Sequence, residues 1–303
     1  MPRKTADFLL FVLLATFWGG SFVAIKFVVQ AFPPVFGAML RVGIAVLVLA
    51  AIFLAERRNL RVPFSLRRKM WLAGLFSQGI PFCFLFWGER QISPGLAGII
   101  NGTVPLWTLL LGLASGNGER FSNRKMIGLL LGLLGIVVIF APLIVFGGTR
   151  GEILGTAAVF AMAVCYGIGA LLSRTLLSGG AKADFRANIF HQHCASFALL
   201  LAVSALLEPW PALSAVLAAK TALWSVFYLG FFSTAIAFLI FFHLLREWGA
   251  VRASAVTYVS PIIALFWDFV FFRNVPRPSE LAGVLMILSG VVLLHAAPAR
   301  KDL

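Results

Sequence analysis

The sequence predicts an all-α polytopic membrane protein with ten transmembrane helices, arranged as two inverted five-helix repeats. Of its 303 residues, 61% are hydrophobic and 12% are charged. Soluble domains have about 25% charged residues, so these charges are too few to cover a soluble surface. The apolar residues form runs close to the roughly 20 residues that cross about 30 Å of hydrocarbon. The Lys and Arg residues gather in alternate gaps between the runs.

The apolar runs follow one another along the chain and leave no room for a soluble domain. Ten runs are predicted to span the membrane: 8–30, 35–55, 71–88, 94–114, 126–146, 153–177, 187–207, 221–243, 250–272 and 280–297. β-Strands are disfavoured, because barrel strands alternate over about ten residues, whereas these runs are longer and continuously apolar. A cleavable signal is not expected, because Trp18 and Lys26 lie where a cleavage region needs small neutral residues.

The distribution of cations predicts the orientation. One set of alternate gaps holds 18 of the 25 Lys and Arg residues, and the other set holds five. Cations concentrate on the cytoplasmic side, so both termini are predicted to be cytoplasmic, in a protein of the inner (plasma) membrane. The net charge of +14 follows from this topology and does not indicate nucleic-acid binding, which needs a basic face on a soluble fold.

Internal similarity predicts the repeat. A shift of 156 residues brings Pro105 onto Pro261, and a shift of 148 brings Trp18 onto Tyr166. Further coincidences at similar shifts are Lys26 with Arg174, Gly74 with Gly230, Ser77 with Ser233, Arg90 with Arg246, Gly128 with Gly283 and Gly135 with Gly290. The repeats comprise residues 1–147 and 148–303. Five helices is an odd number, so the second copy is inverted, which is a recurrent plan of secondary transporters.

Several short stretches then resemble a known family. They are Trp18 to Lys26 (WGGSFVAIK), Arg41, Ala97-Gly98 to Pro105-Leu106, Gly118-Glu119-Arg120 and, in the second half, Ala253-Ser254 to Pro261-Ile262. In this order they resemble the EamA-type branch of the drug/metabolite transporter superfamily, over essentially the whole chain. The chain departs from the branch at Arg273-Asn274, where a Gly-Glu pair is common.

The resemblance implies a secondary transporter or facilitator, most similar to the bacterial amino-acid exporters, including the aromatic amino-acid group. The expected activity is export of amino acids or related small metabolites by alternating access, with a small-molecule substrate and the lipid bilayer as partners. A nucleotide-sugar, sugar-phosphate or drug carrier is the alternative. A phosphate carrier should hold several cations at the midplane, whereas Lys26, Arg41 and Arg174 lie nearer the helix ends.

A solute site is expected near the middle of the membrane. The candidate substrate-binding residues are Trp18, Ser21, Gln78, Phe82, Asn101 and Trp107 in the first half and Tyr166, Ser233, Tyr258 and Ser260 in the second. Tyr166 and Tyr258 lie within their runs rather than at the interface where membrane tyrosines collect. Hydrogen bonding between helices is the alternative role for their hydroxyls.

Ionisable residues within the runs are candidates for gates, because such groups are costly in a membrane. Lys26, Arg41, Glu89 and Asp268 lie toward the predicted outer ends, where an ion pair could close the outer mouth. Arg174 and His243 occupy the corresponding inner positions. The alternative is that long side chains reach the interface and the acids, Glu89 in particular, are interfacial.

Prolines and glycines within the runs have separate roles. Pro105 and Pro261 are predicted helix breaks, since each removes a backbone donor and matching breaks point to a transporter binding site. Gly98 with Gly102, and Gly128 with Gly132, are predicted to allow close helix packing.

The sequence contains no pattern typical of an enzyme. It lacks a phosphate loop, a Ser/His/Asp constellation and metal-ligand spacing, so no enzymatic activity, cofactor or metal is predicted, and a membrane-embedded lipid enzyme is disfavoured. Cys83, Cys165 and Cys194 all lie within apolar runs. Asp268 is the only deep acid expected, and it lies off-centre, which favours facilitated diffusion over proton exchange.

Overall fold

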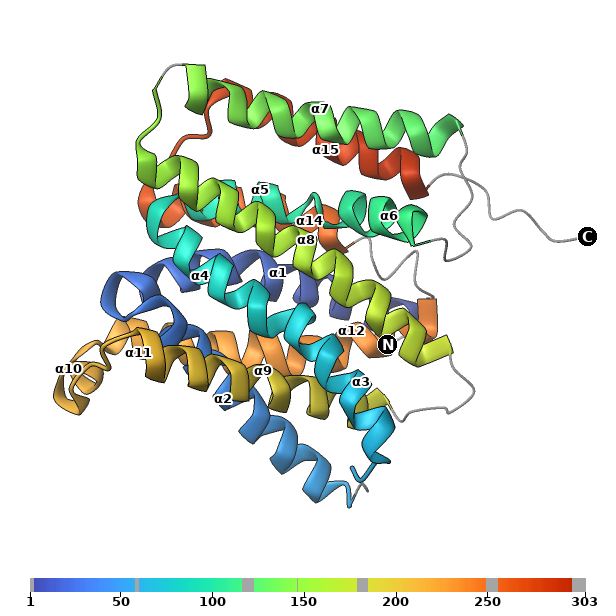
Figure 1. The fold of residues 1–303 in the computed structure, drawn as a ribbon, viewed down its shortest axis with the longest axis vertical. Helices are drawn as coiled ribbons and strands as arrows, with labels where there is room; N and C mark the ends of the chain where they lie inside the picture. The colour runs from blue at the N-terminus through green and yellow to red at the C-terminus, as the bar shows by residue number, and fades with distance from the viewer. Residues whose placement is uncertain are drawn as a thin grey trace, which may run out of the picture.

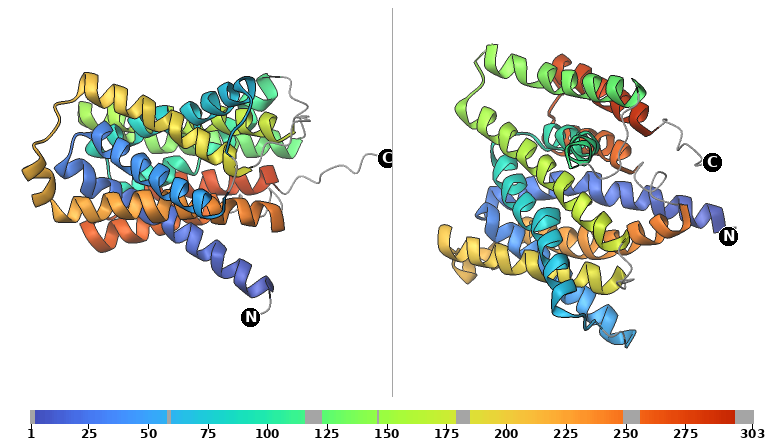
Figure 2. Two further views of the ribbon diagram at one scale, coloured as in Figure 1. Left: turned by 90° about the horizontal axis from the view of Figure 1, so that it is seen from below. Right: turned by 45° about the vertical axis from the view of Figure 1, so that its right-hand side comes forward.

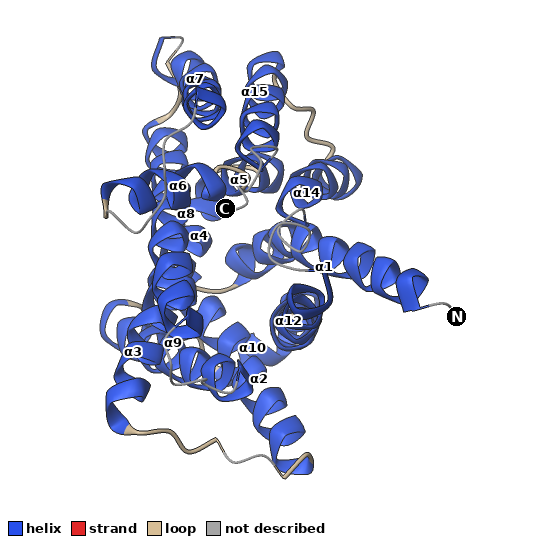
Figure 3. Ribbon diagram, turned by 90° about the vertical axis from the view of Figure 1, so that its right-hand side faces the viewer, coloured by secondary structure: helices blue, strands red, loops and turns tan. Residues whose placement is uncertain are grey.

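The computed structural model describes residues 3–57, 60–115, 123–145, 147–178, 185–248 and 256–295. Every regular element in these residues is a helix (Figure 3). In chain order the helices are α1 Arg3–Ala31, α2 Pro34–Ala55, α3 Phe64–Gly74, η1 Leu75–Gly79, α4 Ile80–Gln91, α5 Pro94–Asn101, α6 Val104–Ala114, α7 Asn123–Val145, α8 Arg150–Ser178, α9 Phe185–Leu207, α10 Leu213–Ala218, α11 Lys220–Phe227, η2 Tyr228–Ile236, α12 Ala237–Trp248, α14 Val256–Phe272 and α15 Pro278–His295.

The surface of this bundle is apolar and its interior holds polar groups. Leu54 is 73% exposed and Leu206 is 81% exposed, whereas Arg41 and Glu89 are 5% and 0% exposed. Eight helical segments of the described chain are long and apolar enough to cross a membrane, and Val256–Phe272 and Pro278–Leu293 are shorter apolar helices at the predicted ninth and tenth spans. The chain is therefore a polytopic membrane protein.

Proline and a capping box determine several helix starts. Pro34, Pro94 and Pro105 lie in the first turns of α2, α5 and α6, where a missing N–H is tolerated. Helix α8 begins with a reciprocal cap, in which the Glu152 N–H donates to Thr149 Oγ1 (3.2 Å) and the Thr149 N–H donates to Glu152 Oε2 (2.9 Å).

The two predicted helix breaks have different outcomes. The fourth span is divided, because α5 ends at Asn101 and α6 begins at Val104, next to Pro105. The prediction of a break at Pro261 is wrong, since α14 continues through this residue. Membrane helices tolerate an internal proline where neighbouring helices and Ser or Thr side chains satisfy backbone groups, and here Ser260 Oγ donates to Val256 O (2.9 Å). A short helix, α10, was not predicted.

Two spans contain π-helical turns, which often occur at functional sites. Segment η1 joins α3 to α4, and η2 joins α11 to α12. A shift of 156 residues places η1 within η2. Gly74 directly precedes η1 and packs so closely on α9 that a Cβ would meet Gln192 O, and Gly230 in η2 packs on α2, where a Cβ would lie 2.7 Å from Arg41 O. The π-helical spans therefore approach α9 and α2 at corresponding positions.

Close glycine contacts join the outermost pair of helices, α7 and α15, which lie side by side at one edge of the bundle (Figures 1 and 2). A Cβ at Gly135 would lie 2.8 Å from Gly283 O, and a Cβ at Gly290 would lie 2.5 Å from Gly128 O. Gly98 of α5 packs in the same way on Ala264 of α14. Small residues allow this close packing in lipid.

The helices run between two ends of the bundle. We call the end at which α1, α4, α9 and α14 finish the capped end, because carboxylates there bind the first amides of α2 and α5. It includes the turns that precede α2, α5, α8 and α15 and lies on the left in Figure 1. The opposite end, where α1 begins, is called the basic end, after the excess of Lys and Arg residues that the sequence predicts on this side.

Candidate functional site

A buried guanidinium lies at the centre of the candidate site. Arg41 of α2 donates from Nε to Thr234 Oγ1 of η2 (3.0 Å). Its guanidinium carbon lies 4.2 Å from the centroid of the Phe82 ring of α4, which is a cation–π contact. Thr234 Oγ1 in turn donates to Leu229 O (2.7 Å), within the π-helical segment. The close approach of α2 at Gly230, one helical turn before Thr234, brings these groups together.

Several buried polar atoms of the bundle interior, including one of Arg41, have no hydrogen-bond partner among the described residues. They are Arg41 Nη1, both amide atoms of Gln78, both carboxylate oxygens of Glu89, Asn188 Nδ2 and His193 Nε2. Buried polar groups are normally hydrogen-bonded, because an unmade bond costs about 1–3 kcal/mol. A group of such atoms inside a membrane bundle therefore indicates a site for something polar.

The third span contributes one face to this site. Gln78, Phe82 and Glu89 lie four and seven residues apart, which places them on one side of the helix. Gln78 is 1% exposed, Phe82 3% and Glu89 0%. The structure therefore buries Glu89 completely within the protein.

Helix α9 contributes three buried polar residues to the bundle interior. His193 Nδ1 bonds with Ile189 O (2.8 Å), and its ring meets Phe238 edge-on with the centroids 5.0 Å apart. Gln192 Nε2 donates to Asn188 Oδ1 (3.0 Å). His191 bonds elsewhere, with Leu60 O (2.9 Å), so the two histidines point in different directions as their spacing predicts.

Four charged residues expected at the outer mouth are neighbours, but within the described chain Lys26 and Arg41 form no ion pair with Glu89 or Asp268. Lys26 Nζ donates to the backbone oxygens of Glu89 (2.7 Å) and Ile92 (2.9 Å) at the end of α4. Cations stabilise helix C-termini. Glu89 interacts electrostatically with Lys26, Arg41 and Asp268.

Asp268 of α14 binds the start of α5, after the turn that joins α4 to α5. Its Oδ2 accepts the Gly95 N–H (2.9 Å) at the start of α5, and its Oδ1 accepts from Asn274 Nδ2 (2.9 Å). Gly95 allows this close approach, because a Cβ there would lie 2.7 Å from Asp268 Oδ2. Lys26 thus interacts with the C-terminal end of the α4 dipole, and Asp268 interacts with the N-terminal end of the α5 dipole. Together they hold the α4–α5 turn.

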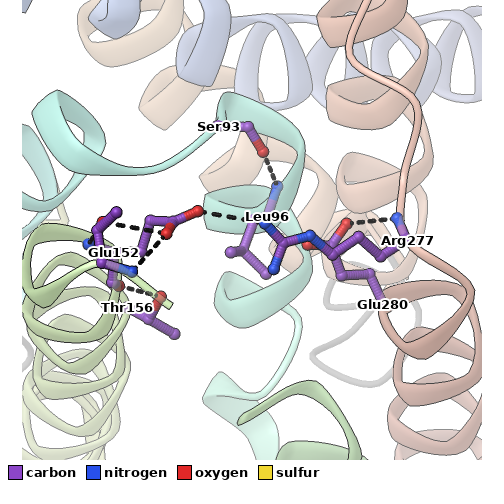
Figure 4. A network of polar contacts seen from close by, with 7 residues as sticks. Ser93, Leu96, Glu152, Thr156, Arg277 and Glu280 are labelled. Atoms are coloured by element: carbon purple, nitrogen blue, oxygen red, sulfur yellow. Dashed lines mark hydrogen bonds and ion pairs between the residues drawn. The ribbon is translucent and has the colours of Figure 1, made fainter. Parts of the chain in front are cut away.

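Further carboxylates organise the capped end. Glu208, after α9, accepts the N–H groups of Val35 (2.8 Å) and Phe36 (2.7 Å) at the start of α2. Glu152 meets Arg277 Nη2 (3.2 Å), and the Arg277 N–H donates to Glu280 Oε2 (2.9 Å). Figure 4 shows this chain of contacts, which links α8 to the start of α15.

The remaining predicted substrate residues mostly bond within the protein. Trp18 packs against Phe241, with the ring centroids 5.4 Å apart. The other contacts are Ser21 Oγ to Trp18 O (2.6 Å), Ser233 Oγ to Phe17 O (2.8 Å), Ser260 Oγ to Val256 O (2.9 Å) and Trp107 Nε1 to Thr103 Oγ1 (3.1 Å). Tyr166 interacts electrostatically with Arg41. Asn101 and Tyr258 are half-buried.

The predicted inner gate residues have other neighbours. His243 Nε2 lies 2.9 Å from Asp7 Oδ1, and Arg174 is exposed near the end of α8. Arg186 pairs with Glu56 (3.0 Å) at the same end. The Gly118-Glu119-Arg120 and Ala253-Ser254 stretches lie outside the described residues.

Sequence analysis did not identify some of the residues that hold the site and the two ends of the bundle. Thr234, Asp7 and Glu208 were missed, although Thr234 follows a predicted site residue, Ser233. Asp7 and Glu208 lie beyond the ends of apolar runs, where a charge is unremarkable. Only their partners in the folded chain give them a role.

A multi-pass bundle with buried, unpartnered polar side chains has the construction of a membrane transporter, because intramembrane ionisable groups mark solute and ion pathways. The chain belongs to the EamA-like transporter family, whose model matches residues 6–141 and again residues 153–296.

Relatives from archaea and bacteria match along almost the whole chain. An uncharacterized transporter of Archaeoglobus fulgidus is 27% identical, over 93% of this chain and 96% of its own length. A probable amino-acid metabolite efflux pump of Escherichia coli is 24% identical, over 97% and 95%. A solved crystal structure with 24% identity has a TM-score of 0.64, over 95% of this chain and 96% of that chain, which shows a shared fold.

Proposed function

We propose that the protein exports amino acids or related small metabolites across the inner membrane by alternating access. The observation that carries the proposal is the set of unpartnered atoms of Arg41, Gln78, Glu89 and His193 in the bundle interior. The name of the Escherichia coli relative, a probable amino-acid metabolite efflux pump, points to the same class of substrate.

The chemistry of the site matches a zwitterion. Arg41 Nη1 and the Gln78 amide N–H groups can donate to a substrate carboxylate, and such charge-assisted bonds are the stronger kind. The Glu89 carboxylate can accept from a substrate ammonium group. Phe82, which already lies against Arg41, offers an apolar surface for the substrate side chain.

We also propose ten transmembrane helices in two inverted repeats, 1–147 and 148–303, with both termini cytoplasmic. The two successive matches to one family model, 147 residues apart at their starts, support this arrangement. So do the glycine contacts between α7 and α15, because a shift of 155 residues converts the Gly128–Gly290 contact into the Gly135–Gly283 contact. Inverted repeats exchange conformations and so provide alternating access.

Transport by the purified protein in liposomes tests the proposal. We expect liposomes loaded with an unlabelled amino acid to take up the labelled one by counterflow. Arg41→Met should reduce counterflow by about 30- to 150-fold, since a charge-assisted bond is worth about 2–3 kcal/mol. The matched control is Arg90→Met, because Arg90 is exposed one residue after Glu89.

Nucleotide sugars, sugar phosphates and cationic drugs form the comparison set in the same assay. If no amino acid moves and one of these does, the substrate assignment is wrong. If Arg41→Met transports amino acids as well as Arg90→Met does, the site is misplaced even though the function stands.

A further inference from the structure

Glu89 is a fully buried carboxylate (0% exposed) whose oxygens have no hydrogen-bond partner in the described part of the chain. An ionised carboxylate in such surroundings is very costly unless it is paired. A carboxylic acid is uncharged and costs much less, so this arrangement favours the protonated form when no substrate is bound.

The cations near Glu89 make their described hydrogen bonds to other groups and none to its carboxylate. The titratable side chains that act on Glu89 are Lys26 of α1, Arg41 of α2, Tyr166 of α8 and Asp268 of α14. Lys26 Nζ donates to two backbone oxygens. Arg41 donates to Thr234 and lies on the Phe82 ring.

Asp268 differs from Glu89 in this respect. Both of its oxygens accept hydrogen bonds, from Gly95 N and from Asn274 Nδ2. These bonds stabilise an ionised carboxylate. The two deep acids of this region therefore have separate roles, with Asp268 holding the α4–α5 turn and Glu89 left without a structural partner.

We propose that Glu89 is the proton-binding site of an exchange reaction, in which a proton and the ammonium group of the substrate occupy its carboxylate alternately. This inference rests on the proposed function. When substrate binds, the O–H bond of the Glu89 acid breaks, the proton passes to water, and the bonding electrons remain on the carboxylate. The carboxylate then takes the ammonium group as its partner. On the other side of the membrane the steps run in reverse.

The reaction has a defined charge balance. One proton enters for each zwitterion that leaves, so one positive charge moves inward in each cycle. A membrane potential that is negative inside should therefore speed export, as should an inward proton gradient. Facilitated diffusion, which the sequence alone favours, predicts no effect of either.

Proton release by the wild-type protein is the first test. Substrate is added to the purified protein in weakly buffered detergent solution that contains a pH-indicator dye, using an amino acid that shows counterflow. We expect about one proton released per substrate bound, and none from Glu89→Gln. Glu56→Gln, which changes a half-exposed carboxylate at the basic end, should release the proton as wild type does.

Liposomes provide the second test. An imposed pH gradient should drive accumulation of the amino acid by the wild type and by Glu56→Gln but not by Glu89→Gln, whose remaining counterflow should not respond to pH. Wild-type counterflow without proton release or gradient response would overturn the coupling and leave the proposed function intact. Proton release by a folded Glu89→Gln would assign the proton to another group. Absence of wild-type counterflow for every amino acid would overturn the proposed function itself.

Discussion

The two ends of the bundle use their charges in different ways. At the capped end, Glu208 and Asp268 accept backbone amides at the starts of α2 and α5, and Lys26 binds backbone oxygens at the end of α4. At the basic end, Arg186 pairs with Glu56 and His243 meets Asp7 through side chains, and His191 bonds with the backbone oxygen of Leu60. A carboxylate on helix amides satisfies groups that have no other partner, whereas a half-exposed ion pair competes with water.

This difference predicts which end of the bundle is more stable. The turns of the capped end are fixed to neighbouring helices by charge-assisted bonds to the backbone. At the basic end the Arg186–Glu56 pair has side chains 25% and 39% exposed, and the His243–Asp7 contact is exposed on the histidine side. We therefore expect the described contacts of the capped end to cost more free energy to break than those of the basic end.

The largest expected effect compares one glutamate from each end. Glu208→Gln removes the charge that two amides of α2 bind, and should lower the free energy of unfolding by about 2–3 kcal/mol. Glu56→Gln removes a half-exposed pair with Arg186 and should cost about 0.5 kcal/mol or less. Unfolding of both variants in mixed detergent micelles measures the difference. Equal losses would remove the distinction between the ends.

A smaller effect is expected for Asp268→Asn, because Asp268 accepts one backbone amide, from Gly95, whereas Glu208 accepts two through both of its oxygens. We expect about 1 kcal/mol of destabilisation, the usual value of a helix N-cap with its dipole interaction. The α4–α5 turn should also open more often. A cysteine at position 107, in a background without Cys83, Cys165 and Cys194, should then react faster with a reagent added at the capped end.

Asp7→Asn is the matched control for this labelling, since Asp7 lies at the basic end and pairs with His243. It should leave labelling at position 107 unchanged. An unchanged rate in a folded Asp268→Asn protein would show that this cap does not hold the capped end closed.

The smallest effect is expected for His243→Gln at the basic end. The His243 side chain is 36% exposed, so the pair is worth about 0.5 kcal/mol, and salt should screen it further. Thermal unfolding at low and high salt measures the loss of stability and its dependence on salt. A loss as large as that of Glu208→Gln would show that the basic end is held as firmly as the capped end.

Much of the architecture follows from composition and pattern. Continuous apolar runs with few charges require helices that satisfy their own backbone in lipid, and the described helices match the predicted runs closely. Pro105 was correctly predicted to divide a span. Pro261 was wrongly predicted as a break, because a membrane helix can continue through an internal proline when neighbouring groups satisfy the freed backbone oxygen.

The sequence by itself determined that this chain is a helical membrane protein and a family member, because hydropathy and motif order are properties of the chain alone. It also identified Arg41, Gln78, Phe82 and Glu89 as candidates. Only the tertiary structure decided what they do, because a partner's distance depends on helix packing. Packing at Gly230 brings Arg41 to Thr234, packing at Gly95 gives Asp268 its amide, and no described residue donates a hydrogen bond to the Glu89 carboxylate.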